Sequence, residues 1–380
     1  MRTPIAWLNL THEKNRLLVA IAGVSFAVIL VFMNLGFLGS LAKTAAILYG
    51  QIDAEIFLIS PQSLEISTTK PFPIERIYQA AGVNGVERVM PLYVGYLQWR
   101  NPETRRNRAI FVYGINPEDP VFIMPELKDP KNLAALRRPD TALIDRLSRP
   151  EFGSQTTGTV TEAKRRQITI GGQYSMGGGF AADGTLILGD QNFRRYFDPF
   201  PLHLINLGLI KLKPGVNPQQ IAAELKRVLP PDVSVYTQEE IIARDRDYWI
   251  NTTSTGFIFT MGVAVSCVVG VVIVYQILYT DISDHMKQYA TLKAMGYRSR
   301  FLFGVVLQEA VILAVLGYIP GFAVSLGLYD VTVRATSGGL PMTMELERAI
   351  FVLLLTLVMC SLSALISVRR VITTDPAEVF

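Results

Sequence analysis

The sequence predicts an α-helical membrane protein with four transmembrane helices in a 1+3 arrangement, and with a large α+β domain inserted between helices 1 and 2. Composition is the first reason. Half of the 380 residues are hydrophobic and 18% are charged, whereas a soluble protein carries about a quarter charged residues. Position is the second reason, because the missing charges leave four long uncharged gaps, as a bilayer requires.

Each gap reaches the length of about 20 apolar residues that a spanning helix needs. The first gap is too long for the apolar region of a cleaved signal peptide, which runs about 7–15 residues, so we expect it to remain as an anchor. We expect the spanning helices at 17–42, 256–280, 301–329 and 349–368.

The distribution of Lys and Arg predicts that both termini are cytoplasmic, because cytoplasmic segments of membrane proteins carry an excess of these residues. Three segments hold nine of them, whereas the loop 330–348, expected to be periplasmic, holds two. Residues 43–255 then lie on the periplasmic side of the plasma (inner) membrane. The three segments are the amphipathic N-terminus 1–16, the segment 281–300 and the tail 369–380, with Arg2, Lys14, Arg16, Lys287, Lys293, Arg298, Arg300, Arg369 and Arg370.

The periplasmic domain shows strand and helix patterns at both of its ends. We expect two β-α-β parts there, flanking a β-rich insertion at about 119–201. One helix start is well marked, because Asn217 is a suitable N-cap, Pro218 suits the first helical position and Gln220 can complete a capping box. Strands are expected at 53–60, 86–99, 108–115, 204–213 and 233–236, and helices at 74–81, 218–229 and 237–248.

Glycines and basic residues in this domain have plain structural interpretations. Gly171 and Gly172 lack the strand-to-helix context of a phosphate-binding loop, so we expect a turn there. The clusters 105–108 and 164–166 are short, and we interpret them as solvated loop or strand ends.

Motifs for catalysis and cofactor binding are missing from the sequence. No G-x-x-x-x-G-K-[ST] motif occurs, so we expect no ATP hydrolysis by this chain itself. The histidines at 12, 203 and 285 fall on both predicted sides of the membrane and cannot share a metal. No basic run interleaved with aromatics suggests nucleic acid. We therefore expect a non-catalytic subunit with no cofactor, no metal and no nucleic-acid partner.

Four residues stand out within the predicted spanning helices. Glu309 is the one acid there, and an acid at mid-bilayer costs about 2.5–3.5 kcal/mol on insertion scales. We expect it near the inner interface, where capping or pairing between helices competes with a functional role. Gly262, Ser266 and Gly270 have the spacing of small residues that lets helices approach closely, within a bundle or across a dimer.

The cytoplasmic segment 281–300 has a pattern of its own. Asp281 and Asp284 open it, which suits the N-terminus of a short interfacial helix, and Gly296 can end that helix. The segment is either a polar connector or an element that docks a soluble partner. The residues we expect at such a contact are Met286, Lys287, Tyr289, Leu292, Lys293, Met295 and Gly296.

Three runs of residues carry a resemblance to a known family. They are Lys287-Gln-Tyr289-Ala-Thr-Leu-Lys293-Ala-Met295-Gly296, the terminal Arg369-Arg370-x-x-x-x-Asp375-Pro376-Ala377-Glu378-Val379, and the opening Trp7-Leu-x-Leu-Thr11-x-Glu13-Lys14-x-Arg16-Leu-Leu with Met33-x-x-Gly36-Phe37. The first two resemble MacB/FtsX-type ABC transporter permeases, as does the order of one span, a large domain and three spans. The opening most resembles the cyanobacterial DevC-like subgroup.

The resemblance implies the permease subunit of an export complex. A separate P-loop ATPase subunit would drive it, and the permease would pass the motion to its periplasmic domains. The implied partners are a second permease copy, a periplasmic adaptor protein, an outer-membrane channel and membrane lipid, with a glycolipid or another envelope substrate as cargo. One alternative is an FtsX-like regulatory permease that controls an extracellular partner without transport. A membrane-anchored sensor is another.

If the segment 281–300 contacts an ATPase, its apolar residues should matter more than its charges. Burying a Met or Leu side chain contributes roughly 1.5–3 kcal/mol, whereas a surface ion pair contributes about 0–1 kcal/mol. Changing Met286, Leu292 or Met295 to Asp should therefore uncouple ATP hydrolysis from export more severely than Lys287→Ala or Lys293→Ala. The measurement is ATPase stimulation and export in reconstituted membranes. Full coupling in every variant would mean that the segment is only a connector.

Overall fold

The computed structural model of the chain divides into two compact units. The helical unit comprises Met1–Gly39, Phe257–Thr332 and Met342–Phe380, and the α/β domain comprises Ser40–Gly256 and Val333–Pro341. The structure describes residues 7, 14–177, 182–201, 203–284, 286, 288, 291, 295, 297, 299–336 and 339–373.

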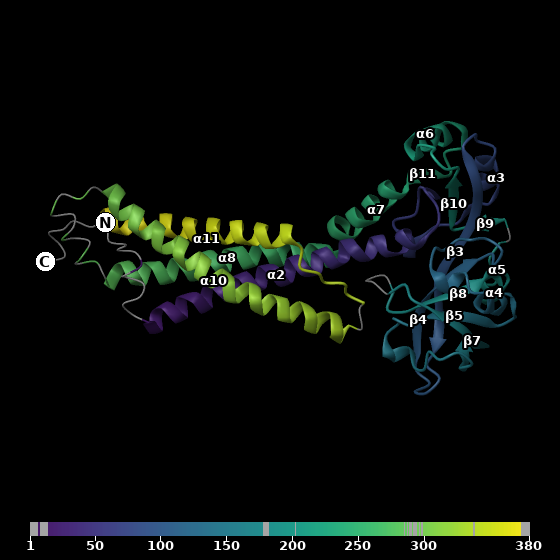
Figure 1. Ribbon diagram of the computed structural model, residues 1–380, viewed down its shortest axis with the longest axis horizontal. Coiled ribbons are helices and arrows are strands. Elements are labelled where there is room, and N and C mark those ends of the chain that lie inside the picture. Colours follow the sequence, from purple (N-terminus) through teal and green to yellow (C-terminus); the bar gives the residue numbers. More distant parts are fainter. Residues whose placement is uncertain are drawn as a thin grey trace. The chain divides into compact units, whose positions relative to one another are not determined.

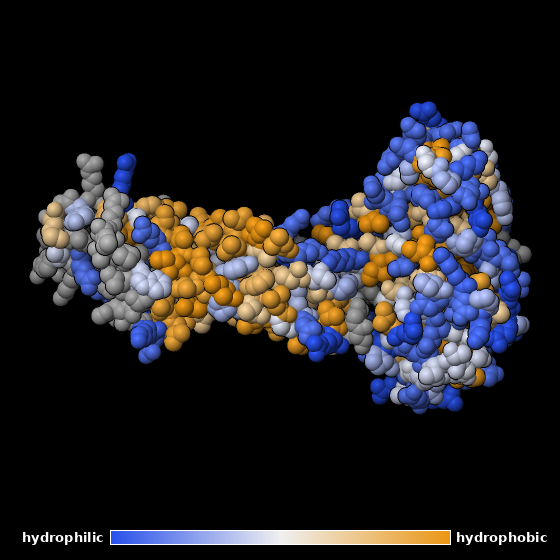
Figure 2. Space-filling view, in the orientation of Figure 1, coloured by the Kyte–Doolittle hydropathy of each residue, from blue (hydrophilic) through white to orange (hydrophobic). Residues whose placement is uncertain are grey.

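Within the described residues, four helices are long and apolar enough to cross a membrane, which confirms the expected number. Figure 2 shows apolar side chains gathered over the surface of these helices, as lipid contact requires. The helices are α2 (Lys14–Gln51), α8 (Ser254–Asp284), α10 (Ser299–Ala335) and α11 (Leu346–Thr373) (Figure 1).

Helix α2 does not end where the uncharged gap ends. The gap ends at residue 42, but the helix continues without interruption to Gln51, and its residues from Ser40 onwards belong to the α/β domain. Alanine and leucine within these last turns are strong helix formers. One helix therefore contributes residues to both units.

The expected start of a new helix at Asp281 is wrong. Asp281 and Asp284 lie in the last turn of α8, at the end of the helix where the dipole disfavours an acid. The Arg16 guanidinium offsets this at one position, because its Nη1 lies 2.7 Å from Asp284 Oδ2. The ion pair joins the first turn of α2 to the last turn of α8.

The two expected β-α-β parts interleave in one antiparallel sheet with the order β11-β1-β10-β3. The connection from β1 to β3 includes α3, and the connection from β10 to β11 includes α6. This is the split β-α-β arrangement. The elements are β1 (Ile56–Ile59), α3 (Glu75–Ala81), β3 (Val86–Arg100), β10 (Leu207–Leu212), α6 (Pro218–Val228), β11 (Ser234–Thr237) and α7 (Gln238–Asp247).

The strands of the predicted insertion continue the same sheet, in the order β3-β4-β8-β5-β7-β6. An additional pairing of β3 with β6 closes these six strands into a small barrel. The long strand β3 therefore belongs to both halves of the domain. The elements are β4 (Asn107–Ile115), α4 (Pro130–Arg137), β5 (Thr141–Asp145), β6 (Val160–Ala163), β7 (Arg166–Tyr174), β8 (Thr185–Gly189) and α5 (Asp190–Tyr196).

Short elements complete the domain. A two-stranded sheet pairs β2 with β9, and a π-helical turn, η4, leads from α7 to α8. The elements are η1 (Ile66–Thr68), β2 (Phe72–Pro73), η2 (Pro125–Leu127), η3 (Pro150–Phe152), β9 (Leu204–Ile205) and η4 (Tyr248–Thr252).

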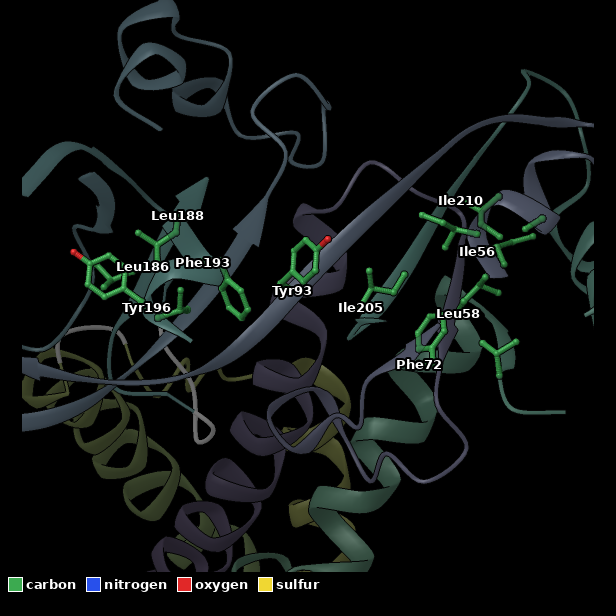
Figure 3. Close-up of a cluster of buried hydrophobic side chains, with 14 of the residues drawn as sticks. Ile56, Leu58, Phe72, Tyr93, Leu186, Leu188, Phe193, Tyr196, Ile205 and Ile210 are labelled. Atoms are coloured by element: carbon green, nitrogen blue, oxygen red, sulfur yellow. The ribbon is translucent and has the colours of Figure 1, made fainter. Parts of the chain in front are cut away.

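Both faces of the sheet are buried, so alternate residues of a strand enter different clusters. In β4, Ile110 and Val112 join one cluster, whereas Phe111 and Tyr113 join the other, as the two-residue period of a strand requires. Figure 3 shows part of the first cluster, in which residues of both halves of the domain lie along one continuous core.

The expected turn at Gly171 and Gly172 is also wrong, because both lie inside strand β7. A side chain at Gly171 would collide with Thr141 and Ala135. The register of β7 against β5 shifts at this point, so Gly171 is the extra residue of a β-bulge. Gly171 and Gly172 therefore lack side chains because α4 and β5 pack closely against this part of β7.

The predicted cap of α6 is confirmed. The Asn217 side chain accepts a hydrogen bond from the Gln219 backbone at 2.9 Å, and Pro218 occupies the first turn. The structure shows a full reciprocal capping box at the next helix, where Thr237 and Glu240 bond to each other's backbone. This box fixes the start of α7.

Candidate functional site: a buried polar junction at the end of helix α2

The last turns of α2 are buried in the core of the α/β domain. Leu48 and Tyr49 belong to the cluster that also contains Phe57 of β1 and Ile241 of α7. The Tyr49 ring packs edge-on against Phe57, with 5.3 Å between ring centroids. The end of α2 is thus an integral part of the core of this domain.

A buried carboxylate on α7 holds this end of α2. Tyr49 donates a hydrogen bond from its hydroxyl to Asp245 Oδ2 at 2.7 Å, and the Ile66 backbone N–H donates to the same oxygen at 3.2 Å. Tyr49 is fully buried and Asp245 is 1% exposed. Both side chains are excluded from water, so the Tyr49 hydroxyl depends on the Asp245 carboxylate as its acceptor.

Arg244 supplies the positive charge that the buried carboxylate needs. Its Nη1 lies 3.4 Å from Asp245 Oδ1, its Nη2 donates to the Ser63 backbone oxygen, and its guanidinium lies over the Tyr236 ring. A second bond to α2 comes from Gln238, whose Nε2 donates to the Tyr49 backbone oxygen at 2.7 Å. We call Tyr49, Gln238, Arg244 and Asp245 the α2–α7 junction.

Burial raises the pKa of Asp245 to about 6, although the Tyr49 hydrogen bond and the Arg244 charge lower it and the nearby Glu65 carboxylate raises it further. Glu65 is itself 1% exposed and accepts hydrogen bonds from Ser67. Two buried acids near one arginine leave the junction short of positive charge. The carboxylate is therefore costly to ionise in the folded domain.

The junction lies where two segments pass from one unit to the other along the chain. Helix α2 begins in the helical unit and ends at the junction, and α7 leads through the π-helical turn η4 directly into α8. The junction cross-links α2 to α7 within the α/β domain. A displacement of either helix is therefore resisted by the same buried hydrogen bonds.

The small residues predicted on α8 face α2 of the same chain. A side chain at Gly262 would collide with Asn34, and one at Gly270 would lie 3.1 Å from Ala27 Cβ. Ser266 accepts a hydrogen bond from Asn34 Nδ2 at 3.4 Å. Glu309 on α10 is fully buried. The structure thus places all four residues in the interior of the helical unit.

The structure describes two of the predicted coupling residues, Met286 and Met295. Met286 lies in a helix and is half-buried, whereas Met295 is 63% exposed. Lys287, Tyr289, Leu292, Lys293 and Gly296 lie outside the described residues.

Sequence reasoning missed Tyr49 and Asp245. Neither belongs to a motif, and Asp245 sits in a helix segment with three other charged residues, Arg244, Arg246 and Asp247. An acid in such a run usually faces solvent. Only the tertiary packing of α2 against α7 distinguishes the buried acid from its neighbours.

Comparison with known proteins supports the predicted class for the C-terminal part of the chain. Residues 260–376 match the family described as FtsX-like permease C-terminal. This segment, less than half of the chain, includes α10 and α11 and most of α8. The comparison with curated proteins gave no match.

Three solved structures are similar to about half of this chain. The extracellular domain of the noncanonic ABC-type transporter YknZ from Gram-positive bacteria is 15% identical, covers 48% of this chain and 99% of its own, and has a TM-score of 0.34. The periplasmic region of MacB from Actinobacillus actinomycetemcomitans is 10% identical, covers 50% of this chain and 92% of its own, and has a TM-score of 0.35. A domain of a putative permease protein from Porphyromonas gingivalis is 16% identical, covers 50% of this chain and 90% of its own, and has a TM-score of 0.30.

The junction predicts a pH-dependent stability of the α/β domain. Asp245 keeps its proton up to a pH of about 6 in the folded chain, but loses it near 3.9 when unfolded. The folded state binds more protons between these values, so stability should fall as pH rises from about 4 to about 6, by roughly 3 kcal/mol. Asp245→Asn removes the ionisation and should remove this fall. The measurement is unfolding of both proteins across this range.

The matched control is Asp247→Asn, an exposed acid two residues further along the same helix. This variant should follow the wild-type curve. A difference between wild type and Asp245→Asn that does not change with pH, or that grows as pH falls, would contradict the account.

Proposed function

We propose that this chain is the permease subunit of an ABC-type export complex in the plasma membrane. It is a non-catalytic subunit that passes motion from a separate P-loop ATPase subunit to its α/β domain. The match of residues 260–376 to FtsX-like permeases supports the class. The carrying observation is that α2 runs unbroken from Lys14 to Gln51 and ends in a buried polar junction.

A helix transmits displacement along its axis only if it is continuous and held at its far end. Every backbone hydrogen bond within α2 resists bending, and the helix contains no proline between Lys14 and Gln51. At its end, Tyr49 and Gln238 bind it to α7 with two hydrogen bonds. Motion applied to α2 in the membrane therefore reaches the core of the α/β domain.

In this proposal both termini and the segment 281–300 are cytoplasmic, and the α/β domain is periplasmic. The ATPase contacts the segment through its apolar residues. The exposed side chains of Met295 and Tyr297 support this. The Tyr297 ring also packs at a tilt against Phe301 of α10, with 4.9 Å between ring centroids. A partner that binds there pushes on a residue already packed against a predicted spanning helix.

The finer points of the proposal rest on sequence resemblance. They are a second permease copy, a periplasmic adaptor protein, an outer-membrane channel, membrane lipid, and an envelope substrate such as a glycolipid, as expected for the DevC-like subgroup. Small residues facing the interior of this chain leave the outer surface of α8 for lipid or the second copy.

A helix breaker in α2 tests the transmission. Proline at position 42 removes the hydrogen bond to residue 38 and kinks the helix, at a cost of about 3 kcal/mol. A fluorophore on a cysteine replacing the exposed Glu224 of α6 reports on the α/β domain. In the chain reconstituted with its ATPase, ATP should change this fluorescence in wild type and not in Ala42→Pro.

Ala42→Ser is the matched control, because it changes the side chain and keeps the backbone hydrogen bond. It should respond to ATP as wild type does, and all three proteins should retain nucleotide hydrolysis by the partner. An ATP response that survives Ala42→Pro would show that α2 does not carry the motion. If ATP does not change the fluorescence of the wild-type protein either, the proposed function itself is wrong.

A further inference from the structure

Helix α5 covers one end of the barrel. Its Phe193 and Tyr196 side chains are fully buried in the first hydrophobic cluster (Figure 3). The Tyr196 hydroxyl donates a hydrogen bond to the Gln167 backbone oxygen at 2.8 Å, and the Asn192 side chain accepts one from the Asp140 backbone at 3.0 Å. Gln167 lies at the start of β7 and Asp140 directly precedes β5. These two strands are parallel, so α5 packs over the end at which both begin.

The turn between β6 and β7 lies at this same end. Strands β3 and β6 are antiparallel, so the turn points away from the β3–β4 loop, which lies at the other end of the barrel. Lys164 in the turn donates a hydrogen bond from its Nζ to the Asp198 backbone oxygen at 3.3 Å. Asp198 follows α5 by two residues. The turn and the C-terminal part of α5 are therefore neighbours.

Electrostatics around Tyr196 connects the basic residues of these two elements. Burial and then the Asp140 carboxylate raise the pKa of Tyr196 above its ordinary value. The charges of Arg195 in α5 and of Arg166 in the turn lower it, because both cations lie near the phenol. The two elements thus form one surface, which we call the basic cap. Its members are Lys164, Arg165, Arg166, Arg194 and Arg195.

Arg194 is the member that most needs an anion. It is half-buried, its Nη2 donates a hydrogen bond to the Tyr93 hydroxyl at 2.8 Å, and its guanidinium lies 5.5 Å from the centre of the Tyr93 ring. Its Nε is buried and has no acceptor. Among the residues that the structure describes, no carboxylate pairs with it. A cation that is shielded from water without a counter-ion is costly, so this guanidinium is suited to receive one.

The carboxylates beside the basic cap leave most of its charge uncompensated. Asp140 pairs with Arg195 at 3.3 Å. Glu162, next to the turn, pairs at 2.7 Å with Arg100, which is not part of the cap. Within the described ranges, the three cations of the segment 164–166 form no ion pair, and all three are exposed. The basic cap therefore presents a positive surface to solvent.

The turn keeps charged residues where other residue types are favoured. Lys164 and Arg165 have φ angles of 46° and 63°, a region that L-residues with long side chains rarely adopt. Two successive positive φ values belong to a hairpin turn that prefers Asn-Gly. Strained backbone of this kind clusters at functional sites. The strain supports a role for these two side chains beyond forming the turn.

The width and place of the basic cap indicate the kind of anion. It extends over the neighbouring strands β5, β7, β6 and β3, which are spaced about 4.8 Å apart, so it is about 14 Å wide, much wider than one phosphate. Thr185, the first residue of β8, lines a cavity with Leu48 of α2, whereas α5 follows the last residue of β8. The cap thus lies at the end of β8 away from α2, which favours a protein over lipid headgroups.

We propose that the basic cap is the docking surface for an acidic segment of a partner protein, and that a carboxylate of this segment binds Arg194. Arginine binds a carboxylate with two parallel hydrogen bonds, and the surrounding cations steer the segment to it. The half-buried Phe197 and Phe200 beside Arg194 supply apolar contact. This inference holds whether the chain transports a substrate or regulates another protein, and it does not rest on the proposed transmission.

The test is photo-crosslinking of the full chain in its native membrane. A photoreactive residue replaces Gln167 beside the turn or Gln191, which lies one helical turn before Arg194, so that all five cations remain. Gln219 on α6 is the distant control position, and all three glutamines are exposed. The two cap positions should capture the same protein, through a peptide in which Asp and Glu outnumber Lys and Arg. Gln219 should not capture it.

Arg194→Gln separates docking from folding. The amide can still donate a hydrogen bond to Tyr93, but the charge is gone, so the crosslink yield should fall about tenfold or more at 0.1 M salt. The unfolding temperature should not fall, because no ion pair within the described chain is lost. Arg195→Gln is the matched control, since that arginine is already paired with Asp140, and it should lower the yield less than about threefold.

Charge reversal on the turn completes the test. R165E/R166E should also lower the yield about tenfold or more, because like charges then face the acidic segment. K131E/K213E makes the same change of charge at exposed sites elsewhere on the domain and should leave the yield unchanged. The proposal is wrong if Arg194→Gln docks as well as wild type, or if the two double variants give equal yields. Capture of no protein, adducts to lipid only, or a captured peptide without acidic excess would equally overturn it.

Discussion

One hydrogen bond between two buried side chains ties α2, the longest helix among the described residues, to the core of the α/β domain. The Tyr49 hydroxyl and the Asp245 carboxylate are both shielded from water, 2.7 Å apart. A polar pair in such a place is a strong constraint, because losing Asp245 removes the acceptor of the buried Tyr49 hydroxyl, at a cost of about 1–3 kcal/mol. The Arg244 guanidinium offsets part of the cost of burying the Asp245 carboxylate, and the Ile66 backbone N–H fixes the orientation of that carboxylate.

An unbroken α2 can pass motion to the α/β domain only because its end is fixed in the core of that domain. A long apolar helix is common to all α-helical membrane proteins, and it can end in a flexible linker. Here the helix continues past the end of the uncharged gap and contributes Leu48 and Tyr49 to a hydrophobic core. The same core receives Ile241 of α7, whose chain returns through η4 to α8. The proposed mechanical transmission needs such a pair of fixed connections.

Regular sequence patterns predicted much of the fold, whereas features that depend on tertiary contacts were not predicted. Uncharged gaps predicted the four long helices, and short apolar runs predicted β1, β3, β4 and β10, because burial follows directly from composition. The closed barrel depends on two residue pairs between β3 and β6, which no local pattern encodes.

The candidate site shows the same limit. The identity of Asp245 as the buried acid depends on contacts between residues almost 200 positions apart. Gly171 is a bulge and not a turn, since its environment is set by α4 and β5. The boundary at Asp281 was misplaced because an acid can end a helix when an arginine from another helix compensates for it.

Amide hydrogen exchange along α2 tests the central claim most directly. If α2 is one continuous helix anchored in the core, the amides from Leu41 to Tyr49 should be protected together and exchange only with opening of the α/β domain. Tyr49→Phe should speed their exchange while leaving the amides of Val24 to Phe32 unchanged. Fast exchange at residues 41–45 in the wild-type chain would reveal a hinge at the end of the uncharged gap, and would contradict transmission through α2.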